Sequence, residues 1–358
     1  MKKAVITSGG TGGHVYPAVA VAKLLAQDGW ETVFIGTESG IEKGIAESEG
    51  LRFLEVESGK FYRRLTLQNF VSIIKVLKGL SGSLKILKSE KPDVVIGFGG
   101  YVCAPAVLAA KLLGIKTALH EQNAYPGLAN RMLSRLVDVT FMTFAGAEKK
   151  LHGRKVLTGL PVRAVIGNRS KAEAIKTLGL KAGVKTVAVI GGSQGGRGLN
   201  KAVYEALPFL KEGVQVVWMT GRNEYGKYSS CPGIDGNPAV MAPFFRNIED
   251  VYAAADLAVI RAGASTVFEV LKCGLPSVLV PFPYSAADHQ RANAKFVNNG
   301  GAGVYLDEAG ISGRSLAEAV NGALFDGKKL EEMSAAARKM FGTDAGLEIL
   351  RELKGIIC

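Results

Sequence analysis

The sequence predicts an α/β fold built from two doubly wound parallel-sheet domains, and three observations support this. The first is a series of short β-branched runs, most of them followed by glycine, at residues 4–10, 31–37, 93–100, 116–123, 186–196, 214–221, 257–263 and 276–282. Segments of helical period, such as PAVAVAKLLAQDG at 17–29, lie between the runs. Near-continuous apolar strands that alternate with helices are typical of parallel sheets covered on both faces.

The second observation is that the two halves of the chain resemble each other. Residues 4–25 and 187–207 each read as a strand, a glycine-rich loop and a helix. The third is length, because 358 residues are too many for one comfortable core and suit two domains. We therefore expect two nucleotide-binding folds that face each other across a cleft.

The boundary between the domains is expected near residues 157–170, where a strand gives way to proline, glycine and asparagine. The first domain then comprises residues 1–162 and the second residues 163–339. The C-terminal stretch reads as helical, and a helix at about 340–358 could pack back on either domain.

The composition is that of a globular protein, with 47% apolar and 21% charged residues. The apolar run near the start, AVIT, is too short for a signal peptide. The longest charge-free stretch, 94–110, contains three glycines and Pro105, which argues against a membrane-spanning helix. The four cysteines, Cys103, Cys231, Cys273 and Cys358, show no CxxC spacing. They therefore indicate neither a disulfide framework nor a zinc site. We expect a cytoplasmic protein.

The net charge of +12 favours an anionic partner, and much of it is concentrated between residues 60 and 91. One acid, Glu90, stands there among eight basic residues: Lys60, Arg63, Arg64, Lys75, Lys78, Lys85, Lys88 and Lys91. Apolar residues interleave with them at near-helical spacing. A basic amphipathic helix of this kind can lie on an anionic membrane surface. Nucleic-acid binding is the other interpretation, but no aromatic stacking platform or recognised motif accompanies the charge.

Glycine clusters at 9–13 and 191–196 follow strands and precede helices, a geometry that binds phosphate or diphosphate. Neither cluster matches GxGxxG or GxxxxGK[ST], although Glu38 stands near the position of the acid that a dinucleotide site needs. A sugar nucleotide fits better, since it offers a diphosphate without a reactive γ-phosphate. The chain has no DxD, so we expect main-chain dipoles and basic side chains, with no metal, to neutralise the diphosphate.

Six motifs together identify a resemblance: GGTGGHVYPAVAVA (9–22), GFGGYVCAP (97–105), HEQNAYPG (120–127), GLPVR (159–163), GGSQGGRGLN (191–200) and DHQRANA (288–294). With them the chain resembles the MurG family, bacterial glycosyltransferases that move N-acetylglucosamine from a UDP donor to lipid I. The resemblance runs from the first strand to about Ala294. It implies a GT-B fold, with the acceptor and the membrane at the N-terminal domain and the donor in the C-terminal one.

The resemblance also implies an activity. The chain would transfer N-acetylglucosamine, with inversion, to the C4 hydroxyl of the muramoyl sugar on a polyprenyl-pyrophosphate acceptor, in peptidoglycan synthesis. No cofactor and no nucleic acid would take part. The enzyme would be peripheral, on the cytoplasmic face of the plasma membrane.

Site residues can be transferred from the same motifs. Those expected to bind UDP-N-acetylglucosamine are Thr11, Gly12, Gly13, Asn123, Arg163, Ser193, Phe245, Ala264, Ser265, Thr266, Val267, Phe268, Glu269 and Gln290. Arg163 would contact the diphosphate, Phe245 the uracil and Glu269 the ribose diol. Glu269 could instead be a helix surface charge, and the hydroxyls of Ser265 and Thr266 could be caps only.

His14 is the one group in the first loop able to accept a proton near pH 7. We expect it to deprotonate the acceptor hydroxyl, which then attacks C1 of the donor sugar. A capping histidine that positions substrate without titrating is the alternative. Candidates for acceptor contact are Gly99, Gly100, Tyr101 and Glu121, although Glu121 could equally be structural, buried beside Asn123.

Three other functions are weighed against this one. Another GT-B enzyme that uses a UDP-sugar, such as a glycolipid synthase or an epimerase, would share the fold and the donor loops. A dinucleotide-dependent oxidoreductase would need the glycine spacing that this chain lacks. A nucleotide-sensing module would need neither His14 nor a membrane-facing helix.

Overall fold

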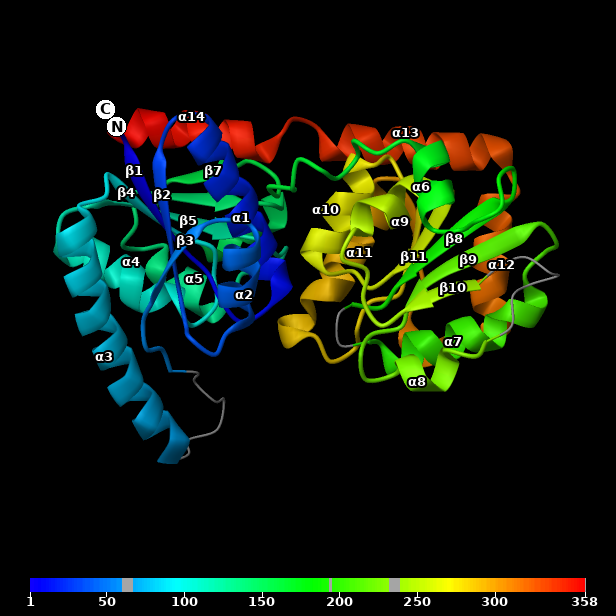
Figure 1. Cartoon of the computed structure of the whole chain (residues 1–358), viewed down its shortest axis with the longest axis horizontal. Helices are drawn as coiled ribbons and strands as arrows, with labels where there is room; N and C mark the ends of the chain where they lie inside the picture. The colour runs from blue at the N-terminus through cyan, green and yellow to red at the C-terminus, as the bar shows by residue number, and fades with distance from the viewer. Residues whose placement is uncertain (60–66, 193–194, 232–238, 358) are drawn as a thin grey trace. The chain divides into compact units, whose positions relative to one another are not determined.

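The computed structural model describes residues 1–59, 67–192, 195–231 and 239–357, and only the backbone of residues 67–73 and 286. It divides into two compact units, each with one parallel sheet between layers of helices (Figure 1). The N-terminal unit comprises Met1–Arg163 and Thr343–Cys358, and the C-terminal unit comprises Ala164–Gly342. The chain therefore crosses between the units twice, after residues 163 and 342.

Within the described residues, seven strands form the sheet of the N-terminal unit. Their spatial order is β3 (Arg52–Glu55), β2 (Glu31–Gly36), β1 (Lys3–Thr7), β4 (Val94–Gly97), β5 (Lys116–Glu121), β6 (Val139–Met142) and β7 (Lys155–Leu157). All neighbours run parallel. The chain extends the sheet from β1 to β3 and then returns to β4 beside β1. This reversal places the carboxyl ends of β1 and β4 next to each other.

Helices cover both faces of this sheet (Figure 1). One layer contains α1 (Gly12–Gln27), α2 (Ile41–Ser48) and α14 (Ala345–Ile357), and the other contains α3 (Leu67–Glu90), α4 (Cys103–Leu112) and α5 (Leu128–Leu133). A short 3-10 helix, η1 (Ala145–Lys150), follows β6. Side chains of β1 alternate between the layers, because Ala4 and Ile6 contact the first and Val5 the second. Burial on both faces explains the continuous apolar runs.

The C-terminal helix α14 packs on α1 of the N-terminal unit. Its Ile349 and Leu353 are fully buried there. At the periphery of the contact, Lys354 pairs with Asp28 at 2.8 Å. The last helix is thus part of the N-terminal unit, although α13 (Gly327–Phe341), which precedes it, belongs to the other unit.

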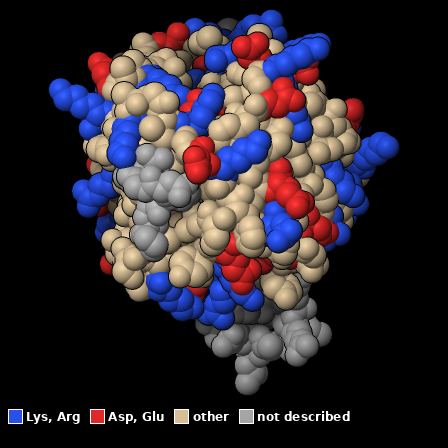
Figure 2. Space-filling model, turned by 90° about the vertical axis from the view of Figure 1, so that its right-hand side faces the viewer, with Lys and Arg blue, Asp and Glu red and all other residues tan. Residues whose placement is uncertain are grey.

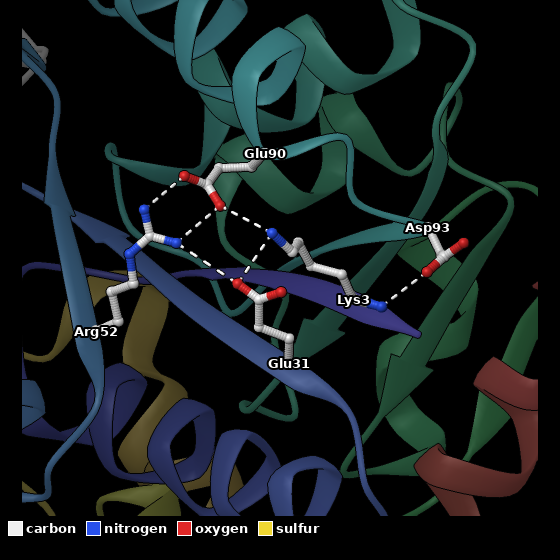
Figure 3. Close-up of polar contacts among 5 residues, drawn as sticks. All are labelled: Lys3, Glu31, Arg52, Glu90 and Asp93. Atoms are coloured by element: carbon white, nitrogen blue, oxygen red, sulfur yellow. Dashed lines mark hydrogen bonds and ion pairs between the residues drawn. The ribbon is translucent and has the colours of Figure 1, made fainter. Parts of the chain in front are cut away.

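A charge network joins the end of α3 to the amino-terminal edge of the sheet (Figure 3). The Glu90 carboxylate accepts hydrogen bonds from Arg52 at 2.7 and 2.9 Å and from Lys3 Nζ at 3.1 Å. Lys3 also pairs with Glu31 at 2.9 Å, and its backbone N–H donates to Asp93 at 2.7 Å. The bonds from Arg52 lower the pKa of Glu90. Glu90 is the only acid of α3, and Lys78 of that helix pairs with Glu57, which precedes the helix, at 3.6 Å.

Within the described residues, the sheet of the C-terminal unit has six parallel strands. Their order is β10 (Ala239–Ala242), β9 (Val214–Met219), β8 (Lys185–Ile190), β11 (Leu257–Ile260), β12 (Ser277–Leu279) and β13 (Gly303–Tyr305). The chain reverses here as it does in the first unit, and β11 returns to lie beside β8. The carboxyl ends of these two strands are therefore neighbours.

Helices α7 (Arg197–Ala206) and α12 (Gly313–Leu324) cover one face of this sheet around the buried Trp218. The other face carries α9 (Ile248–Ala254), α10 (Ala264–Lys272) and α11 (His289–Asn299) (Figure 1). Helix α6 (Lys171–Thr177) lies against α9, and α13 lies against α10. The remaining short helices are α8 (Tyr225–Tyr228), η2 (Leu207–Phe209), η3 (Ala286–Asp288) and η4 (Glu308–Gly310).

The predicted doubly wound architecture is confirmed, and each of the eight predicted runs contains a strand. Four further strands were not predicted, namely β3, β6, β10 and β13, and β7 is the strand expected to end near residue 157. Of the basic segment, Lys60, Arg63 and Arg64 lie outside the described residues, whereas Lys75 to Lys88 lie on α3. Within the described chain, no helix is both long and apolar enough to span a membrane.

Candidate active site

Two glycine turns meet at the carboxyl ends of β1 and β4. Gly10, Gly99 and Gly100 have φ angles of +96°, +82° and +81°, in the left-handed region that favours glycine. A Cβ at Gly100 would lie 2.3 Å from the carbonyl oxygen of Gly9, so the turns touch backbone to backbone. In open α/β sheets, ligands bind at the carboxyl ends of the strands where the strand order reverses. The turns mark that place in the N-terminal unit.

His14 enters this place from the first turn of α1. The helix begins after Thr11, whose carbonyl accepts the His14 N–H at 3.0 Å. The half-buried imidazole faces the second turn, because a Cβ at Gly99 would lie 3.3 Å from its Cδ2 and 3.4 Å from its Nε2. The ring of Tyr101 lies 3.9 Å from the corresponding Cβ position of Gly10. The structure therefore brings together the predicted residues Thr11, Gly12, Gly13, His14, Gly99, Gly100 and Tyr101.

Glu121 holds the loop that carries Asn123. Its carboxylate is 2% exposed and accepts bonds from the backbone N–H groups of Asn123 (2.9 Å) and Gly127 (3.1 Å) and from Asn130 Nδ2 (2.9 Å). Burial raises the pKa of Glu121. This arrangement is the structural role that the sequence left open for Glu121. We therefore keep Asn123, but not Glu121, among the residues proposed to contact substrate.

His120 ties β5 to the segment that ends in Arg163. Its Nε2 lies 3.0 Å from the carbonyl oxygen of Gly159, and because a carbonyl only accepts, Nε2 carries the proton. Burial lowers the pKa of His120 to about 4. Arg163, four residues after Gly159, places its guanidinium 4.9 Å from the ring centre of Tyr16 on α1. Arg163, which is predicted to contact the diphosphate, thus lies beside the start of α1.

In the C-terminal unit, the second glycine loop follows β8 and leads into α7. Gly192 and Gly195 have φ angles of +92° and +85°, and Gly196 caps the helix. Ser193, the predicted phosphate contact, lies outside the described residues. The loop thus brings backbone to the start of a ten-residue helix, at the point where β8 meets β11. Helix starts of this kind bind anions.

Arg261, which sequence reasoning missed, lies against this loop. The residue is 6% exposed, its Nη1 donates to the carbonyls of Val280 (3.1 Å) and Pro281 (3.3 Å), and it pairs with Glu308. A Cβ at Gly196 would lie 2.8 Å from its Nε, so the guanidinium is packed against the loop backbone. An arginine inside the otherwise apolar run LAVIRAG was the available signal. Because Arg261 pairs with Glu308, it holds the loop in place and adds no net positive charge there.

The start of α10 supplies the second part of the donor site. Gly263 caps the helix, so Ala264, Ser265 and Thr266 occupy its first turn, where N–H groups have no helical partner. The side chains of Val267 and Phe268, which were also predicted to contact the donor, are buried, with 0% and 3% exposed. The Val267 N–H also donates to Gly263 O at 2.9 Å. We therefore leave these two residues out of the proposed site.

Glu269 and Gln290 are the polar side chains predicted to bind the donor's two sugars. Glu269 lies on α10, is 9% exposed, and accepts a 2.7 Å hydrogen bond from the hydroxyl of Tyr252. Gln290 lies at the start of α11, where its Oε1 accepts the Phe282 N–H at 2.9 Å. This bond fixes the orientation of the Gln290 amide, so that its Nε2 is the donor group. Phe245, predicted beside the uracil, is half-buried after β10.

The chain matches two family descriptions. Residues 4–142 match the Glycosyltransferase family 28 N-terminal domain, and residues 186–347 match the Glycosyltransferase family 28 C-terminal domain. Together with two doubly wound sheets that carry glycine loops at their reversal points, these matches define a family 28 glycosyltransferase with the GT-B fold.

Relatives define the family more narrowly. A protein from Bacillus licheniformis is 40% identical over 98% of both chains, and one from Halothermothrix orenii is 37% identical over 94% of both. Both are named UDP-N-acetylglucosamine–N-acetylmuramyl-(pentapeptide) pyrophosphoryl-undecaprenol N-acetylglucosamine transferase. The crystal structure of Acinetobacter baumannii MurG matches with a TM-score of 0.78 at 29% identity, over 99% of this chain and 100% of that one. The chain belongs to the MurG family, as its motifs predicted.

Proposed function

We propose that the chain transfers N-acetylglucosamine from UDP-N-acetylglucosamine to the C4 hydroxyl of the muramoyl sugar of lipid I, and so forms lipid II. The observation that carries this proposal is 40% identity, along 98% of both chains, to a relative named for that transfer. The glycine loop at the β8–β11 reversal and the start of α10 offer N–H groups to a diphosphate.

The C-terminal unit binds the donor in this proposal. The diphosphate accepts hydrogen bonds from N–H groups at the start of α7 and in the first turn of α10, and Arg261 holds the loop before α7 in place. Glu269 accepts the ribose hydroxyls, and the Nε2 of Gln290 donates to the N-acetylglucosamine. As the bond to C1 breaks, negative charge develops on the leaving UDP. N–H dipoles already aimed at that charge stabilise it without reorganisation.

The N-terminal unit binds the acceptor and supplies the base. His14 lies beside the backbone turn at Gly99, where a Cβ would lie 3.3 Å from Cδ2 of the ring, and its imidazole is half-buried. In its neutral form the ring accepts the proton of the C4 hydroxyl while the oxygen attacks C1. Attack opposite the leaving UDP inverts the configuration and gives a β-linked product.

Helix α3 is proposed to dock the enzyme on an anionic membrane. Ile74 and Leu77 are 44% and 60% exposed, and Lys75, Lys78, Lys85 and Lys88 are exposed on the same helix. Ile74, Leu77, Lys78, Lys85 and Lys88 follow helical spacing along one face. In contrast, basic and acidic side chains are interspersed on the face shown in Figure 2. A lipid acceptor would be delivered where α3 meets the surface.

A transfer assay tests the proposed function. The protein is incubated with UDP-N-acetylglucosamine, labelled in the sugar, and a lipid I analogue, without added metal. We expect label in a disaccharide product and none without the acceptor. UDP release without the acceptor would indicate hydrolysis, and formation of an epimeric sugar nucleotide would support the epimerase alternative. Either result without disaccharide would contradict the proposal.

A further inference from the structure

The contact between Tyr252 and Glu269 links two helices behind the donor site. Tyr252 lies on α9 and is 3% exposed, and its hydroxyl donates to Oε2 of Glu269 on α10 at 2.7 Å. Both side chains are buried, so the bond excludes water. A hydrogen bond to an ionised oxygen is shorter and about twice as strong as one between neutral groups.

The bond restricts what the carboxylate of Glu269 can do. A carboxylate has two oxygens and accepts about four hydrogen bonds in fixed directions. Its terminal torsion is broad when nothing holds it. With Oε2 fixed by Tyr252, the plane of the group is set and Oε1 faces a defined direction. A preset acceptor is well suited to two adjacent hydroxyl groups, because less rotational freedom is lost on binding.

We propose that Tyr252 is a positioning residue that orients Glu269 toward the ribose diol and thereby contributes to the choice of ribonucleotide over deoxyribonucleotide. The inference rests on the proposed function, in which Glu269 accepts the ribose hydroxyls. Tyr252 itself touches no substrate. It acts through the carboxylate, so its effect must depend on the presence of the 2′-hydroxyl.

The surroundings of Tyr252 make it suitable for a conservative test. Its ring lines a pocket of about 440 Å³ at the amino-terminal edge of the sheet, together with Cys273 of the α10 end and Arg338 of α13. The ring therefore keeps its packing in Tyr252→Phe, and only the hydroxyl is lost. Tyr305 provides a matched control, because its hydroxyl donates to Asp307 Oδ2 at 3.0 Å in the same unit.

The experiment measures dissociation constants of UDP and 2′-deoxyuridine diphosphate by calorimetry. The proteins compared are the wild type, Tyr252→Phe, Tyr305→Phe and Glu269→Gln. We expect Tyr252→Phe to raise the dissociation constant of UDP about fivefold, which corresponds to the free energy of one hydrogen bond. The dissociation constant of 2′-deoxyuridine diphosphate should change less than about twofold. Tyr305→Phe should bind both ligands as the wild type does. In Glu269→Gln the preference for UDP should disappear.

Each other outcome has a definite meaning. Equal weakening of both ligands in Tyr252→Phe, or no weakening of UDP, would overturn the inference, because a merely structural tyrosine cannot sense one hydroxyl group. If Glu269→Gln loses the preference for UDP while Tyr252→Phe keeps it, the inference fails and the ribose assignment stands. If Glu269→Gln also keeps the preference, or the wild type does not bind UDP, the proposed donor site itself is wrong.

Discussion

Two histidines of the N-terminal unit, His14 and His120, lie in different surroundings and are assigned different roles. His14 is half-buried at the start of α1 and lies beside backbone turns, whereas His120 is fully buried, stacked on Phe98 with ring centres 5.3 Å apart. His120 keeps its proton on Nε2 for the Gly159 carbonyl and stays neutral in the folded protein. Of these two histidines, His14 is therefore the one proposed to exchange a proton with substrate.

Replacing His14 by alanine should slow the reaction without weakening donor binding. General base catalysis contributes about 10²–10⁴-fold, so we expect kcat of His14→Ala to fall at least about a hundredfold. The KM for UDP-N-acetylglucosamine should change less than about threefold, because His14 is proposed to act on the acceptor hydroxyl. His152→Ala, at an exposed histidine, is the control. Near-normal kcat in His14→Ala would remove His14 from the chemistry.

His120 should make the fold sensitive to acid. Its pKa is lowered from 6.5 to about 4 by burial, so the unfolded chain takes up a proton that the folded chain refuses. Stability is therefore lost as the pH falls from about 6.5 toward about 4, and by linkage the loss between pH 7 and pH 5 is about 2 kcal/mol. Urea denaturation of the wild type and of His120→Gln, whose amide can still donate to Gly159, measures this loss. Equal pH dependence in the two proteins would contradict the assignment.

At the scale of helices and strands, most central strands were predictable and most edge strands were not, and the interior strand β6 was also missed. Strands such as β1 and β11 are buried on both faces, so their sequences are continuously apolar. The edge strand β3, RFLE, is only partly buried and carries charges at both ends, and the edge strand β13 has three residues. Such short segments lack a periodic signal.

Reversing the charge of lysines on helix α3 should weaken binding to anionic membranes. Lys78→Glu combined with Lys85→Glu should reduce retention by anionic vesicles at low salt, because each basic residue near such a surface contributes about 1 kcal/mol. Lys201→Glu combined with Lys328→Glu makes the same change in net charge on other helices and should bind nearly as the wild type does. Co-sedimentation at low and high salt measures both. Equal retention by neutral vesicles would contradict an electrostatic dock.

For the whole molecule, motif spacing predicted two doubly wound sheets and the loops at their reversal points. The loop residues could be predicted because glycine clusters between strand and helix have a local physical cause. Arg261 and Tyr252 could not, since their roles depend on contacts with Gly196 and Glu269 that local sequence does not encode. The burial of the Val267 and Phe268 side chains likewise depends on packing that the motif alone does not encode.

A crystal structure of the protein with UDP-N-acetylglucosamine tests the central claim most directly. We predict the diphosphate on N–H groups at the start of α7 and in the first turn of α10, with the ribose hydroxyls on Glu269. A nucleotide bound elsewhere, with these N–H groups facing only water, would contradict it.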